Sequence, residues 1–129
     1  MIKTKELMLG NWVYAGVKTQ FPMQVLGVFK DVAYLDFEGN EGDFFEYKEE
    51  EMLPVPLTEE VFKKNGFKYL CGVYYLEEDT ETEFRKEHDG YFYLSYDLSD
   101  YVFTDKPIKY VHQLQNILTL VGIDIDLKI

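Results

Sequence analysis

Few side chains in this sequence are suited to acid–base, nucleophilic or metal chemistry. The chain has 129 residues, with 2 His, at positions 88 and 112, and 1 Cys, at position 71. His88 precedes an Asp-Gly pair typical of a hairpin tip, whereas His112 falls in a predicted helix, so their spacing sets no fixed relation between the imidazoles. A single cysteine excludes an intramolecular disulfide and a zinc site built from cysteines. We therefore predict no metal, no cofactor and no catalytic residues.

Carboxylates are abundant, but their patterns do not predict a site. Residues 36–43 place oxygen-bearing side chains at alternate positions, as a calcium loop does. An EF-hand needs Gly at the sixth loop position and Glu at the twelfth, where this chain has Glu41 and Tyr47. The adjacent acids at 49–51 and 59–60 lack the enclosing pocket that would separate their pKa values. Because serine-elbow, phosphate-loop and dinucleotide motifs are also missing, enzyme activity is not favoured.

One predicted helix carries an unusual polar face. No charged residue occurs between positions 110 and 123, although solvent-facing helix surfaces are normally rich in Lys and Glu. The uncharged polar residues of this face are His112, Gln113, Gln115, Asn116 and Thr119. Either these side chains hydrogen-bond a neighbouring sheet or nearby backbone, or they form a recognition or dimer face.

Trp12 is the second candidate for a binding role. It follows Gly10-Asn11 in a predicted strand, a position that favours a core anchor, with stacking on a ligand as the alternative. A pocket near Trp12 and His112, between the two halves of the chain, would be the place for a small ligand or an enzyme reaction.

The charge is strongly negative and unevenly distributed. Asp plus Glu number 24 against 13 Lys plus Arg, a formal net charge of −11, which disfavours direct binding to nucleic acids and anionic membranes. Residues 36–60 hold ten acids and one base, Lys48, and residues 77–89 hold seven acids and two bases. Such blocks indicate solvated surface. The alternatives are a surface that meets a basic partner and one that mimics the phosphates of a nucleic acid.

Two regions of secondary structure are expected. Residues 1–56 predict a small SH3-like β-module, with short strands at 11–14, 23–29, 32–37, 44–47 and 52–55. Residues 57–129 predict a helix over 59–65, a meander with strands at 69–76, 83–88, 91–96 and 101–104, a helix over 110–121 and a one-sided strand at 123–129. Asp89-Gly90 favours a two-residue type I′ turn. We thus expect an α+β fold of two parts, or one continuous core.

Four segments resemble, in this order, an uncharacterised family of small proteins from gut Bacteroidetes, their phages and their mobile elements. They lie at 9–14, 54–60, 65–67 and 110–116, and the most specific is the last, Tyr-Val-His-Gln-Leu-Gln-Asn. The resemblance spans nearly the whole chain except residues 69–104. It implies that the protein is carried by a phage or mobile element. It supplies no activity and no catalytic residue.

Together these features favour a non-enzymatic interaction protein. A lone cysteine and the lack of a secretory or membrane-spanning apolar run predict a cytoplasmic location. The expected partner is a protein, bound through the acidic surface or the uncharged helix face, and a homodimer is compatible with the pattern. A small-ligand protein or enzyme and an acidic nucleic-acid mimic are the alternatives.

Overall fold

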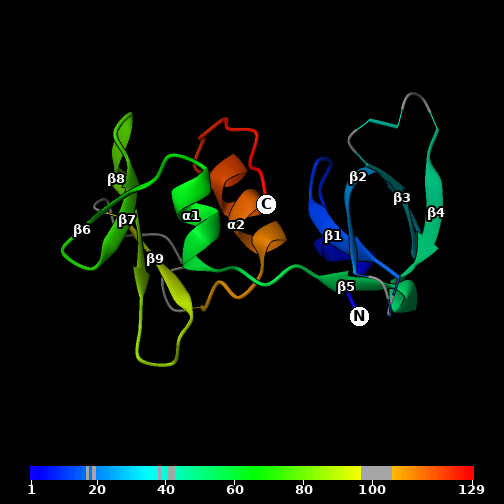
Figure 1. Ribbon diagram of the computed structural model, residues 1–129, viewed down its shortest axis with the longest axis horizontal. Coiled ribbons are helices and arrows are strands. Elements are labelled where there is room, and N and C mark those ends of the chain that lie inside the picture. Colours follow the sequence, from blue (N-terminus) through cyan, green and yellow to red (C-terminus); the bar gives the residue numbers. More distant parts are fainter. Residues whose placement is uncertain (17, 19, 38, 41–42, 97–105) are drawn as a thin grey trace. The chain divides into compact units, whose positions relative to one another are not determined.

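The computed structural model describes residues 1–16, 18, 20–37, 39–40, 43–96 and 106–129 (Figure 1). The chain divides into two compact units. The first comprises Met1–Pro56 and Tyr110–Ile117, and the second comprises Leu57–Lys109 and Leu118–Ile129. The described residues form two antiparallel sheets and two α-helices, so the predicted α+β fold with a C-terminal helix is confirmed.

The first unit is built on a five-stranded antiparallel sheet. Its elements are the 3-10 turn η1 (Thr4–Glu6), β1 (Trp12–Ala15), β2 (Phe21–Phe29), β3 (Val32–Asp36), β4 (Phe45–Lys48), the 3-10 turn η2 (Glu49–Glu51), β5 (Met52–Pro54) and most of α2 (Val111–Leu120). The strand order is β4-β3-β2-β1-β5. The last strand thus returns to pair with the first, as expected for a small SH3-like module.

Alternating side chains in the strands form the core of this unit. In β3, Ala33 and Leu35 are fully buried while their neighbours are only half-buried, so the predicted period of two holds. The register between β2 and β3 shifts between Val25 and Gly27, which interrupts the alternation at Leu26. The buried residues of the core are Ile2, Leu7, Val13, Ala15, Met23, Val25, Ala33, Leu35 and Met52.

The second unit packs a short helix on one face of a four-stranded sheet. Its elements are α1 (Glu59–Lys64), β6 (Lys68–Leu70), β7 (Val73–Leu76), β8 (Asp79–Lys86) and β9 (Phe92–Tyr96), with the strand order β6-β7-β8-β9. The Phe62 ring of α1 lies 4.8 Å from the rings of both Tyr74 and Phe92, and 5.5 Å from that of Phe84. This aromatic cluster covers one face of the sheet and leaves its other face outside the core.

The predicted strand over 69–76 is wrong, because a tight hairpin divides it. Leu70 pairs with Val73, and the two residues between them, Cys71 and Gly72, have φ of +52° and +85°. Two positive φ values are what a type I′ turn requires. The apolar run around Cys71 concealed this turn, since cysteine is not among the residues that signal it.

The predicted two-residue turn at Asp89-Gly90 is also wrong. Gly90 has φ of +85°, whereas Asp89 is not among the residues with positive φ. The N–H of Glu87 donates to the Tyr91 carbonyl at 3.0 Å, and the N–H of Gly90 donates to the Glu87 carbonyl at 3.0 Å. These bonds define a three-residue loop over 88–90, and β8 ends at Lys86 rather than at position 88.

The C-terminal segment 123–129 is not a strand, contrary to its alternating pattern. The side chain of Asn65 binds it instead: the Lys128 N–H donates to Asn65 Oδ1, and Asn65 Nδ2 donates to the Lys128 carbonyl, both at 2.7 Å. The alternating pattern still matches the burial of the side chains, since Leu127 is buried while Asp126 and Lys128 are exposed. The predicted strand at 101–104 lies outside the described residues.

The positive φ of Cys71 in the Cys71-Gly72 turn leads to a prediction about the stability of variants at this position. Asn adopts positive φ more readily than other non-glycine residues. We therefore expect Cys71→Asn to raise the free energy of unfolding by about 0.5–1 kcal/mol relative to Cys71→Ala, which removes the thiol and keeps an ordinary side chain at the turn. Urea unfolding followed by circular dichroism measures this difference, and equal values for the two variants would contradict the turn.

Candidate functional site

The uncharged face of α2 lies against the N-terminal loop of the first unit. Gln115 Oε1 accepts the backbone N–H of Trp12 at 2.8 Å, and Gln115 Nε2 donates to the carbonyl of Gly10 at 3.0 Å. The same carbonyl also accepts Gln24 Nε2 at 3.1 Å. One glutamine side chain thus binds both an N–H and a C=O of the loop that leads into β1.

Asn116 extends this network. Its Oδ1 accepts Asn11 Nδ2 at 2.9 Å, and its Nδ2 donates to the carbonyl of Glu6 at 2.9 Å. Asn11 is buried, and its own Oδ1 accepts the N–H of Met8 at 2.8 Å. The loop around Asn11 is therefore held by amide side chains that satisfy one another and the loop backbone, an arrangement costly to disrupt.

The remaining predicted site residues are not gathered at one place. Gln113 Oε1 accepts the N–H of Tyr110 at 3.1 Å, at the start of its own helix, and Thr119 is exposed within the second unit. Trp12 is 7% exposed in β1. The hydrogen bonds of Gln113, Gln115 and Asn116 therefore correspond to the alternative in which these amides bind nearby backbone and side chains.

His112 is the most unusual member of the helix face. It is 2% exposed, and neither ring nitrogen has a hydrogen-bond partner in the described structure. Glu6 Oε1 lies 4.0 Å from Nε2, and the imidazole stacks on Tyr110 with ring centroids 5.9 Å apart. Burial lowers the pKa of His112 below its ordinary value, and the Glu6 carboxylate partly opposes this shift. The imidazole is therefore neutral near pH 7.

The segment at 36–43 does not assemble cation ligands where it is described. Asp36 Oδ1 accepts the N–H of Phe37 at 2.8 Å and Asn40 Nδ2 at 2.7 Å, so its oxygen is used within the turn. Positions 38, 41 and 42 lie outside the described residues. Over the part of the chain that is described, no group of three or more His, Cys, Asp or Glu side chains is placed to hold a metal ion.

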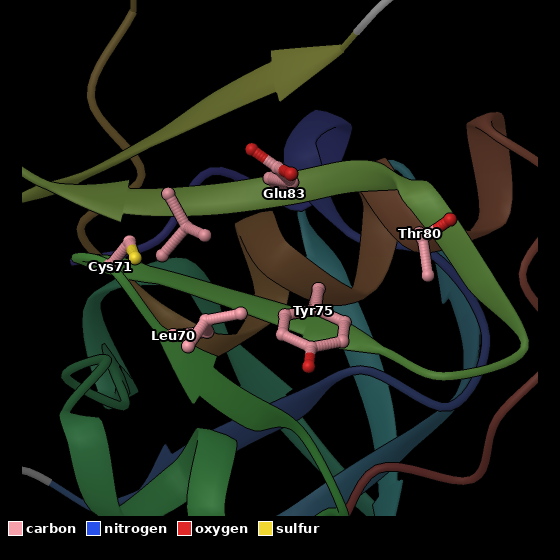
Figure 2. Close-up of a pocket in the computed structure, with 6 residues that line it drawn as sticks. Leu70, Cys71, Tyr75, Thr80 and Glu83 are labelled. Atoms are coloured by element: carbon pink, nitrogen blue, oxygen red, sulfur yellow. The ribbon is translucent and has the colours of Figure 1, made fainter.

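A groove that the sequence did not indicate lies on the outer face of the second unit's sheet (Figure 2). It has a volume of about 460 Å³ and crosses the hairpin of β6 and β7 and the adjoining part of β8. The residues that line it are Leu70, Cys71, Val73, Tyr75, Thr80 and Glu83. The groove depends on the Cys71-Gly72 turn, which brings Leu70 beside Val73, so a prediction of one continuous strand could not find it.

Exposed phenylalanines form a second feature, on the first unit. Phe44 is 62% exposed and Phe45 is 42% exposed, both within the acidic segment 36–60. The Phe44 ring lies 5.5 Å from that of Tyr34 in an edge-to-face contact. These two rings, with Leu26 and Gly27, line a groove of about 390 Å³ that we call the Phe44 groove.

Comparison of the chain with protein-family models, with curated proteins and with solved structures found no match. No helix within the described ranges is both long and apolar enough to cross a membrane.

The amide network should contribute measurably to stability. Asn116→Ala removes the partner of Asn11 Nδ2 and of the Glu6 carbonyl, so we expect the free energy of unfolding to fall by about 1–3 kcal/mol. Gln115→Ala should lower the free energy of unfolding by a similar amount. Leu120→Ala, at an exposed position of the same helix, should change it by less than about 0.5 kcal/mol. Chemical denaturation of the three variants tests this, and equal losses at positions 116 and 120 would contradict it.

Burial of His112 predicts a pH dependence. Because the pKa of His112 is lowered in the fold, the unfolded chain binds more protons below about pH 6.5, and stability declines as the pH falls through that value. His112→Leu should flatten the plot of unfolding free energy against pH between about pH 7.5 and pH 5.5. The matched control is His88→Gln at an exposed position, which should leave the slope unchanged. A slope unaffected by His112→Leu would refute this assignment.

Proposed function

We propose that this chain is a non-enzymatic protein-interaction module whose Phe44 groove and surrounding acids bind a basic protein partner. The observation that carries the proposal is the exposure of Phe44 inside an acidic segment. Acids alone are explained by solubility, but a phenylalanine more than half exposed beside them is not. An apolar centre with a charged rim is the usual composition of a protein interface.

The local geometry supports this use of Phe44. Tyr34, whose ring contacts Phe44, is directly opposed to Glu46 in the β3–β4 register, so an acidic residue is paired with one of the rings of the groove. Asp43 and Glu46 are both exposed. A partner with basic side chains around an apolar one would match this pattern, since opposite charges steer the encounter and the aromatic rings supply the buried area.

The same reasoning assigns the amides of α2 to folding. The segments around positions 11 and 116 are two of the four that carry the family resemblance, and they hydrogen-bond to each other. A face engaged in this way offers a partner few unsatisfied groups. The proposal includes two further points. The protein is carried by a phage or mobile element, as the resemblance implies, and it is located in the cytoplasm, which suits the exposed thiol of Cys71.

The test compares Phe44→Ser with Leu120→Ser. Leu120 is a comparably exposed apolar residue that lies in the second unit, so its substitution controls for general loss of surface hydrophobicity. A partner isolated from host lysate with the unaltered chain is purified, and its dissociation constant is measured at about 0.15 M salt. We expect Phe44→Ser to weaken binding by about tenfold or more, which is about 1.4 kcal/mol, and Leu120→Ser to leave it within about twofold.

Equal binding by the Phe44→Ser variant would refute this surface as the binding site. If the purified partner binds nucleic acid and a DNA duplex competes with the chain for it, the acidic mimic is supported instead of an ordinary interaction module.

A further inference from the structure

We propose that the groove on the outer face of the second unit's sheet binds an arginine side chain presented by a partner protein. This site is separate from the Phe44 groove and does not depend on it. The inference rests on three features of the groove: an apolar floor, the half-buried ring of Tyr75, and the carboxyl group of Glu83 on the adjacent strand.

The floor consists of side chains that the core of the unit does not use. Val73 and Tyr75 alternate along β7 with Tyr74 and Leu76, which are buried on the opposite face. Leu70 of β6 is 59% exposed and pairs with Val73. Figure 2 shows the Leu70 and Tyr75 side chains next to each other, with Glu83 on the adjacent strand. This surface is suited to the aliphatic stem of a long side chain.

Glu83 supplies the acidic side chain of the groove, from the strand next to Tyr75. The two residues are directly opposed in the β7–β8 register, and side chains in such a pair begin about 5 Å apart. The nearby bases have other acidic partners: Lys68 Nζ lies 4.0 Å from Glu77, and Arg85 Nε binds Glu87. Among the described residues, Glu83 therefore has no ion-pair partner, although it is half-buried in the groove wall.

These groups select arginine among the side chains of a partner. The acids at 77–79 and 81 disfavour an anion, and a neutral apolar group would leave Glu83 without a counter-charge. Lysine would supply the charge as a hydrated point, whereas a guanidinium is planar and can stack on Tyr75 while donating two hydrogen bonds to Glu83. The volume of about 460 Å³ is within the range of pockets that enclose small groups.

The test uses capped single amino acids as probes of the whole ¹⁵N-labelled chain. N-acetylarginine methylamide should shift the amide resonances of Tyr75 and Glu83, with a dissociation constant of about 1 mM. The lysine analogue should bind at least about threefold more weakly, because it cannot stack or form the two-point hydrogen bond. The citrulline analogue, which keeps the shape and loses the charge, should produce no saturable shift.

Variants then assign the binding to the proposed atoms. We expect Glu83→Gln to weaken the arginine probe about fivefold or more, and Tyr75→Leu to weaken it while leaving the apolar floor in place. Glu78→Gln, which removes an exposed acid outside the groove lining, is the matched control and should change binding less than about twofold. The amide spectra of all variants verify that each one is folded.

Equal binding of the arginine and citrulline probes, or an unchanged affinity in Glu83→Gln, would overturn the proposal. Shifts confined to residues outside the groove would do the same. Phe44→Ser should bind the arginine probe as the unaltered chain does, so the outcome at this groove is independent of the outcome at the Phe44 groove.

Discussion

The first unit depends on amide side chains that satisfy the backbone of its N-terminal loop. Gln115 binds the N–H of Trp12 and the C=O of Gly10, and Asn116 binds Asn11 and the C=O of Glu6. Without these partners, the peptide groups next to the buried residues Asn11 and Trp12 would be left unsatisfied, at a cost comparable to that of a lost hydrogen bond for each. This constraint explains why the helix carries amides where a surface helix carries charges: a charged side chain here would be desolvated without a counter-ion.

The two units carry similar features on the surfaces that their cores do not use. In each, one face of the sheet is used for the core, by aliphatic residues in the first unit and by the rings around Phe62 in the second. What remains outside is a mixture of acids with a few aromatic residues, such as Phe44 on the first unit and Tyr75 on the second. The partners proposed for both surfaces are cationic, because the face of an aromatic ring and a carboxylate both attract positive charge.

Local patterns predicted most of the elements. They failed where the residue types indicate one local structure and the backbone adopts another. The predicted strand at 32–37 corresponds to β3, and the predicted helix over 110–121 matches α2 to within one residue at each end. The run around Cys71 has the apolar character of a strand, yet its φ values belong to a turn. At Asp89-Gly90 the sequence correctly indicated a turn but not its length. The dipeptide typical of a two-residue turn occurs here in a three-residue loop, because the Glu87–Tyr91 pairing sets the register.

The sequence by itself determined the negative charge, the types of most of the elements and the absence of a cysteine-based staple, since each follows from composition or from patterns a few residues long. Only the tertiary structure decided which side chains meet. Trp12 and Gln115 are 103 residues apart, and no periodicity relates them. Exposure is equally non-local: Phe44 and Phe62 are the same residue type, and one is exposed while the other is the centre of a core. Packing between distant segments makes that distinction, because burial is a property of the surroundings and not of the residue.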